Sequence, residues 1–188
     1  MTGRRQYRLS RWAALAAPLL LWLPVQAQTL LEDQSGRTII GSDLAVLEAG
    51  EDRNDLPCTV SPVKPLLGFD LKFHAGFDIS VPLRELAGSE NLLTILFRVT
   101  SQDQKSAPVY FSQKIRVPSV EEDAKGDATL QGAFDTGEGK YRVEWLMRDR
   151  SERVCAHLWD AEAELRAKDK SRELSLAGGV VAPVETEQ

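Results

Sequence analysis

Apolar side chains occupy every second residue through the middle of the chain. The longest such run comprises Phe69, Leu71, Phe73, Ala75, Phe77, Ile79, Val81 and Leu83, with mostly polar residues between them. Successive side chains of a strand point to opposite faces of a sheet, so this alternation predicts one buried and one solvated face. Because the run exceeds the usual strand length, we expect a bend, bulge or turn at His74-Ala75-Gly76.

Further segments repeat the alternation, and turn residues separate them. The pattern recurs over residues 93–99, 109–117, 128–134, 141–147 and 154–165, with predicted turns at 88–91, 102–108, 125–127 and 135–139. Residues 148–153 indicate a hairpin tip between the last two strands. Leu83 to Leu86 indicate one helical turn. Short strands at this spacing are typical of an antiparallel sandwich. We therefore predict an all-β domain of about seven strands over residues 58–166.

The segment Gly139-Lys140-Tyr141-Arg142-Val143 resembles the start of the sixth strand of immunoglobulin-type sandwiches. In that family a tyrosine near the start of this strand hydrogen-bonds back to an earlier backbone group. The resemblance implies an Ig-like or fibronectin-type sandwich with Tyr141 in this role. It concerns architecture alone, because one fold hosts many activities. Val143 stands where antibody domains carry a cysteine, and Trp145 lies on the tyrosine strand rather than on the third.

Cys58 and Cys155 are the two cysteines of the chain. In an oxidising compartment such a pair predicts one disulfide. By the chain-entropy model, closing a loop of this length stabilises the fold by about 4–5 kcal/mol. The alternative, a catalytic thiol, needs a base, and neither His74 nor His157 has a recognisable protease context. We interpret His74 as a solvated side chain and His157 as one packed near the disulfide.

The first 27 residues have the organisation of an export signal. Four arginines precede an uncharged apolar run from Trp12 to Val25, and Val25-Gln26-Ala27 places small residues at the cleavage site. The run is shorter than the ~20 residues that span a bilayer, so we expect cleavage and no membrane insertion afterwards. The leucine-rich core favours the general secretory route, whereas Gly3-Arg4-Arg5-Gln6-Tyr7 leaves twin-arginine export open. The expected location is periplasmic or secreted.

The segments that flank the predicted domain are less regular. Residues 28–57 are polar and glycine-containing, with Thr38-Ile39-Ile40 and Leu44 to Leu47 as short elements of undecided type, and residues 167–188 indicate a disordered tail. Removing the four signal arginines leaves 19 Lys+Arg against 28 Asp+Glu, a net charge of −9 in place of −5. An acidic domain repels phosphate backbones, which argues against nucleic-acid binding.

The sequence contains no recognisable catalytic, metal or cofactor motif. Glycine-rich phosphate loops and G-x-S-x-G are absent, and the two cysteines are assigned to the disulfide rather than to zinc. Two acidic loops, residues 121–127 and 135–138, leave calcium open if they approach one another, although solvated turns are the ordinary case. We therefore predict neither an enzyme nor a cofactor.

Candidate binding residues come from two sources: the predicted hairpin tip, and side chains that the alternation of a strand (the parity of the residue number) places on its outer face. Parity places Phe111 inward and Tyr110 outward, and Trp159 on the face of Cys155 and His157; outward rings can anchor a partner. Candidate contact residues are Tyr110, Trp159, Arg148, Arg150 and Arg153. These observations favour a non-enzymatic binding or assembly module of the cell envelope, with a protein partner recognised at an exposed strand edge. The alternative is a carbohydrate-active or hydrolytic protein that uses two loop carboxylates.

Overall fold

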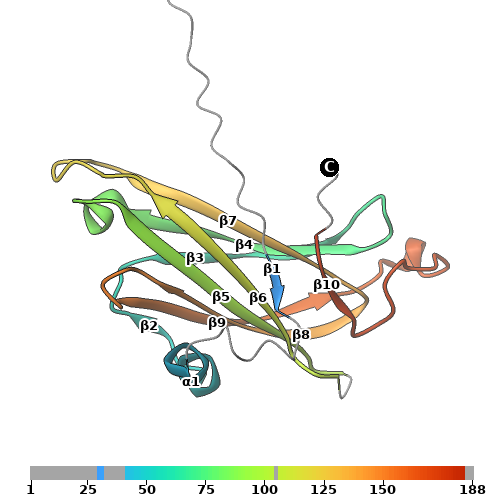
Figure 1. Cartoon of the computed structure of the whole chain (residues 1–188). Coiled ribbons are helices and arrows are strands. Elements are labelled where there is room, and N and C mark those ends of the chain that lie inside the picture. The colour runs from blue at the N-terminus through green and yellow to red at the C-terminus, as the bar shows by residue number, and fades with distance from the viewer. Residues whose placement is uncertain (1–28, 32–40, 104–105, 185–188) are drawn as a thin grey trace, which may run out of the picture.

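Figure 1 shows a computed structural model of the chain, which describes residues 29–31, 41–103 and 106–184. The predicted export signal and Thr38-Ile39-Ile40 lie outside these residues. One sheet has the spatial order β1 (Thr29–Leu31), β6 (Val109–Val117), β5 (Asn91–Ser101), β8 (Gly139–Arg148), β9 (Val154–Ala163) and β2 (Arg53–Asn54). The other has the order β10 (Val181–Pro183), β7 (Asp127–Thr136), β4 (Phe73–Pro82) and β3 (Thr59–Leu67). All pairs are antiparallel.

The prediction of an antiparallel, disulfide-linked β fold is confirmed. The seven long strands are β3 to β9, and they form the orders β6-β5-β8-β9 and β7-β4-β3. Immunoglobulin-type sandwiches divide their strands between two sheets in a similar way. The predicted helical turn is also present, as the 3₁₀ helix η2 (Leu83–Leu86).

Aromatic rings fill the space between the two sheets. The ring of Phe77, on β4, lies 5.2 Å from that of Phe97, 5.7 Å from that of Trp145 and 6.1 Å from that of Trp159. Phe97 in turn stacks on Phe111 at 4.7 Å. All five rings are buried, and all lie on alternating positions of their strands. The period-two pattern therefore marks the residues that form the core.

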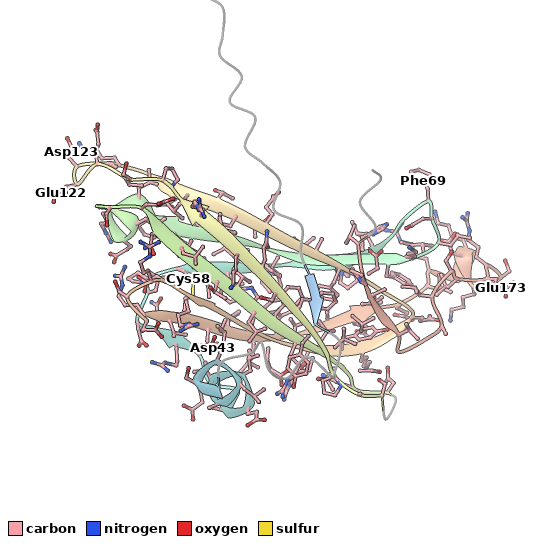
Figure 2. The ribbon with its side chains drawn as sticks, in the orientation of Figure 1. Asp43, Cys58, Phe69, Glu122, Asp123 and Glu173 are labelled. Carbon is pink, nitrogen blue, oxygen red and sulfur yellow. A yellow bond between two sulfur atoms is a disulfide. The ribbon has the colours of Figure 1, made fainter. Side chains whose placement is uncertain are left out.

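Of the bend, bulge or turn expected at residues 74–76, β4 itself shows no bend, but the register of its partner β3 shifts opposite them, between Val63 and Leu66, which pair with Gly76 and His74. β4 runs through these residues in continuous register with β7, and the chain turns earlier, where the backbone N–H of Gly68 donates to the carbonyl of Lys72 at 2.8 Å. Phe69 stands fully exposed at the tip of this turn, as Figure 2 shows. The alternation of apolar residues in the sequence therefore extends across this turn, although Phe69 is not part of the strand or of the core. At Gly76 a side chain would come within 2.3 Å of the carbonyl oxygen of Gly132, so this glycine permits close strand packing rather than a bend.

The segment before the first long strand contains a helix that the sequence did not resolve. α1 (Gly41–Ala49) lies on the outer face of the six-stranded sheet, where Leu47 is buried with Leu96 and Leu146 (Figure 1). Isolated helices this short are marginal in water. Packing on the sheet therefore stabilises α1, and that contact is not visible in the local sequence.

Part of the expected disordered tail is also ordered against the domain. The 3₁₀ helix η3 (Ala167–Asp169) is followed by β10, which pairs with the last residues of β7. The backbone N–H of Ser175 donates to the carbonyl of Leu71 at 3.0 Å, and its hydroxyl to the carbonyl of Asp70. These backbone contacts require the folded domain as a template, which explains why composition alone indicated disorder.

Tyr141 makes the backbone contact that the resemblance implied. Its hydroxyl donates to the carbonyl of Gly137, four residues earlier, at 2.9 Å, and its side chain is fully buried. Burial raises the pKa of this phenol, an effect that the backbone of Gly179 and the hydroxyl of Thr136 oppose. The bond fixes the turn between β7 and β8.

Replacing Tyr141 by phenylalanine should lower the free energy of unfolding by about 1–2 kcal/mol, because the ring remains buried while the hydrogen bond to Gly137 is lost. Urea unfolding of both proteins measures this difference. An unchanged transition midpoint would show that the hydroxyl has no stabilising role.

The disulfide between Cys58 and Cys155 joins the two sheets on one side of the fold. Its residues lie 97 positions apart in sequence, just before β3 and at the start of β9, with a Cα–Cα distance of 6.3 Å. The bond restricts the unfolded chain more than the folded one.

Replacing both cysteines by serine should therefore destabilise the protein by about 2–5 kcal/mol. Guanidinium unfolding measures the loss. In the unmodified protein, alkylation without a reductant should label neither cysteine. Strong labelling would contradict the assignment of Cys58 and Cys155 to a structural disulfide.

Candidate functional site

The two aromatic side chains predicted to bind a partner lie on opposite faces of the six-stranded sheet. Trp159 points into the core, 9% exposed, and packs against Phe77, so its assignment as a contact residue is corrected. Trp159 shares a face of β9 with Cys155, and the structure shows that this face is turned into the core. Tyr110 does point outward, but it is half-buried against the cluster that α1 covers. The two rings therefore form no common platform.

The hairpin tip predicted over residues 148–153 is present between β8 and β9, but two of its three arginines form ion pairs within the protein. Arg148 lies beneath α1, with its guanidinium 3.3 Å from Asp43 and 2.5 Å from Glu152. Burial raises the pKa of Asp43; the charge of Arg148 lowers it, and that of Glu152 raises it further. A partner cannot reach the Arg148–Asp43 pair without displacing the helix.

Arg153 has a similar structural role, whereas Arg150 is exposed. The guanidinium of Arg153 donates to Asp149 at 2.9 Å, to the carboxylate of Glu85 at 3.0 Å and to its backbone carbonyl at 2.7 Å. Burial alone would lower the pKa of Arg153, but these two carboxylates raise it. Arg153 thus fixes the hairpin tip to η2. Of the three arginines, Arg150 is the fully exposed one, whereas the side chain of Arg153 is 35% exposed.

The long strands at the sides of the sandwich present edges of different character. β3 carries Pro62 and Pro65, which lack backbone donors, together with Lys64. Beyond the short contacts of β1 and β2, β6 exposes Lys114 and Arg116, and β9 exposes Asp160 and Glu162. Prolines and charges of this kind protect an edge against pairing with another chain. Three of the four edges are therefore protected.

The edge of β7 is the exception. β10 pairs only with Phe134 to Thr136, and among the residues that the structure describes no strand pairs with Ala128–Gly132 on this side. This stretch contains neither a proline nor a charged residue. An uncharged strand edge without a partner is a template for strand addition.

Apolar side chains accompany this edge. β3 packs beside β9, so β7 and β6 both lie on the opposite side of the sandwich, as Figure 1 shows. Five core-packed apolar residues there are only partly buried: Ile115, Val117, Val120, Ala128 and Leu130. We call this set the β6–β7 seam. This side of the sandwich combines a strand edge that no described strand pairs with and apolar side chains that are incompletely covered.

A second cluster lies at the far end of β7. His74 and Asp135 face one another across β4 and β7, with Nδ1 2.7 Å from a carboxylate oxygen of Asp135, which is 1% exposed. Nε2 of the same ring lies 3.0 Å from Asp70, and Lys72 pairs with the other oxygen of Asp135 at 3.8 Å. The sequence interpretation of His74 as a merely solvated side chain missed this contact. The opposing register of residues 74 and 135 is the signal that would have found it.

The two acidic loops that left calcium open do not approach one another. Residues 121–127 end at the first residue of β7 and residues 135–138 begin at its second-last residue, so the seven extended residues 128–134 separate them. At about 3.3 Å per residue this exceeds any shared coordination sphere. Figure 2 places Glu122 and Asp123 at the end of the molecule opposite Phe69.

Two carboxylates arranged for sugar hydrolysis are not found at the His74 cluster. An imidazole separates Asp70 from Asp135, and the pKa of Asp70 is lowered: slight burial raises it, but the backbone N–H of Lys72 and the charge of His74 outweigh that effect. A general acid requires a raised pKa instead. The geometry of this cluster therefore gives the hydrolytic alternative no support.

Comparisons with known proteins identify no family. No family model and no curated protein matches the chain. It is similar to the X-ray structure of the Northeast Structural Genomics Consortium target SoR45, with 12% identity, a TM-score of 0.33, and coverage of 61% of this chain and 94% of that one. A likeness of this extent carries no argument about function. Within the described ranges, no helix is long and apolar enough to cross a membrane.

Replacing Asp70 by asparagine should reduce stability near neutral pH, by less than about 1 kcal/mol because the pair with His74 is half-exposed. The folded-state pKa of Asp70 lies below its ordinary value of 3.8, so its contribution is present above that value and is lost as the pH falls. Urea unfolding at several pH values measures the difference between the two proteins. A difference that grows on acidification would contradict this assignment.

Proposed function

We propose that this protein is an exported, non-enzymatic binding or assembly module of the cell envelope. It takes up an extended segment of a protein partner along the free edge of β7. The observation that carries the proposal is the uncharged, proline-free edge at Ala128–Gly132, beside partly buried core residues. Strand addition uses main-chain hydrogen bonds and needs no catalytic motif.

The backbone groups available on β7 follow from its pairing with β10. The N–H of Gly137 donates to Val180 at 3.0 Å, on the side away from β4. Backbone groups alternate sides along a strand, and the register of β7 with β4 is continuous. By this alternation, Thr129 and Gln131 direct their N–H and C=O groups away from β4. They are the groups that a partner strand would pair with.

The chemistry of the partner follows from the β6–β7 seam. An added strand would point alternate side chains inward, over Ala128 and Leu130 and toward Ile115 and Val117 on β6. Apolar side chains at those positions would complete the core, whereas charged ones would be buried without partners. We therefore infer that the ligand is an extended protein segment with apolar residues at alternate positions.

Export is part of the same proposal. The disulfide suits a non-reducing environment, and the first 27 residues have the composition of a cleaved signal. A periplasmic or secreted location is consistent with both. The acidic net charge of the remaining chain is consistent with a protein partner rather than with nucleic acid.

Replacing Thr129 by proline removes one outward backbone donor while leaving the pairing of β7 with β4 in place. A soluble probe peptide of alternating valine and threonine, with lysine at both ends, should bind the unmodified protein and perturb the amide resonances of Thr129 and Gln131. In Thr129→Pro the affinity should fall at least tenfold, because a main-chain bond is lost and the ring obstructs the edge.

The matched control is Thr129→Ala, which keeps the N–H and should retain binding. Thermal unfolding of each variant checks that the fold persists. Resonance changes confined to β3, or equal peptide affinity in Thr129→Pro and Thr129→Ala, would contradict the proposal. A dimer that dissociates in Thr129→Pro would instead assign the edge to a second copy of the chain.

A further inference from the structure

We propose that His74 and Asp70 form a binding site for a divalent transition-metal ion, and that Asp135 holds the imidazole in place. The proposal is independent of the strand edge, because the cluster lies at the other end of β7. It rests on the two contacts of the His74 ring, which differ in burial and therefore in role. Asp135 is 1% exposed, whereas the side chains of His74 and Asp70 are 42% and 44% exposed.

The buried side of the ring has the arrangement found behind metal-bound histidines. Nδ1 donates to the carboxylate of Asp135 at 2.7 Å, which fixes the ring orientation and leaves Nε2 as the ligand atom. A carboxylate behind the far nitrogen also makes the imidazole a stronger ligand. Because Asp135 faces His74 in the register of β4 and β7, this support is part of the sheet.

The exposed side of the ring offers a pair of ligand atoms at a suitable separation. Nε2 lies 3.0 Å from a carboxylate oxygen of Asp70. Two ligands of a tetrahedral zinc ion, each at about 2.0–2.1 Å, stand about 3.3 Å apart. A metal ion that replaces the proton between these atoms therefore requires a movement of only a few tenths of an ångström. Water can supply the remaining ligands, because both side chains reach solvent.

The loop that carries Asp70 is held in position rather than free. Gly68 and Lys72 close it by a backbone hydrogen bond of 2.8 Å, and Ser175 bonds the carbonyls of Asp70 and Leu71. At Gly68 a side chain would come within 2.3 Å of Nε2, so the glycine leaves this nitrogen unobstructed. Both ligands are thus positioned by backbone contacts before an ion binds.

Charge and ligand type indicate the class of ion. Lys72 pairs with Asp135 at 3.8 Å, so once an ion has displaced the proton at Nε2, Asp70, Asp135 and Lys72 together carry one negative charge beside the neutral imidazole. That charge favours a cation. One nitrogen and one carboxylate ligand suit zinc or copper, whereas calcium and magnesium prefer oxygen ligands alone. Binding at Nε2 releases the proton that this nitrogen shares with Asp70.

The test is calorimetric titration of the untagged, chelator-treated protein with zinc chloride. We expect one saturable site and release of up to one proton, measured in buffers of different ionisation enthalpy. His74→Gln and Asp70→Asn should each weaken zinc binding at least tenfold. Asp135→Asn should weaken it about 10- to 100-fold although both ligand residues remain.

The matched control is His157→Gln, because the chain has two histidines and His157 also contacts a carboxylate, that of Asp52, at 2.9 Å. This variant should bind zinc normally. Zinc should also shift the Nε2 resonance of His74, a readout that does not depend on stability. The absence of saturable binding, an unchanged affinity in His74→Gln, or an equal loss in His157→Gln would overturn the proposal.

Discussion

The burial of alternate side chains between two sheets is the interaction on which the rest of this structure depends. Phe77 contacts Phe97, Trp145 and Trp159, and so joins rings from both sheets. Burying one such ring contributes about 1.5–3 kcal/mol by area alone. Strand register, the side on which the disulfide forms and the position of every edge follow from which residues enter this core.

A sandwich of two open sheets leaves edges, and here the edges are not equivalent. Prolines occupy β3, and charged residues occupy β6 and β9, all of which oppose the pairing of another chain. β7 has neither protection over Ala128–Gly132, and the apolar residues of the β6–β7 seam lie beside it. This difference between edges connects the fold to the proposed binding role.

Two segments outside the long strands, α1 and the chain after β9, pack against the sandwich. Asp43 of α1 pairs with Arg148 on the outer face of one sheet, and in the chain after β9 Ser175 bonds the loop of Asp70 while β10 pairs with the end of β7. Charged residues that a sequence presents as surface contacts are in this way used internally. His74 lies between two carboxylates, one buried and one exposed, because the register of β4 with β7 sets Asp135 opposite it and the preceding loop carries Asp70.

The sequence by itself determined the strand periodicity, the disulfide partners, the Tyr141 contact and the hairpin tip, because each depends on local alternation, on a residue count or on a known strand start. Only the tertiary structure decided that Trp159 is buried, that Phe69 is exposed and that Arg148 lies beneath a helix. It also decided that His74 meets Asp135, 61 residues away. These outcomes depend on which sheet face is covered and on how distant strands align, and local sequence encodes neither.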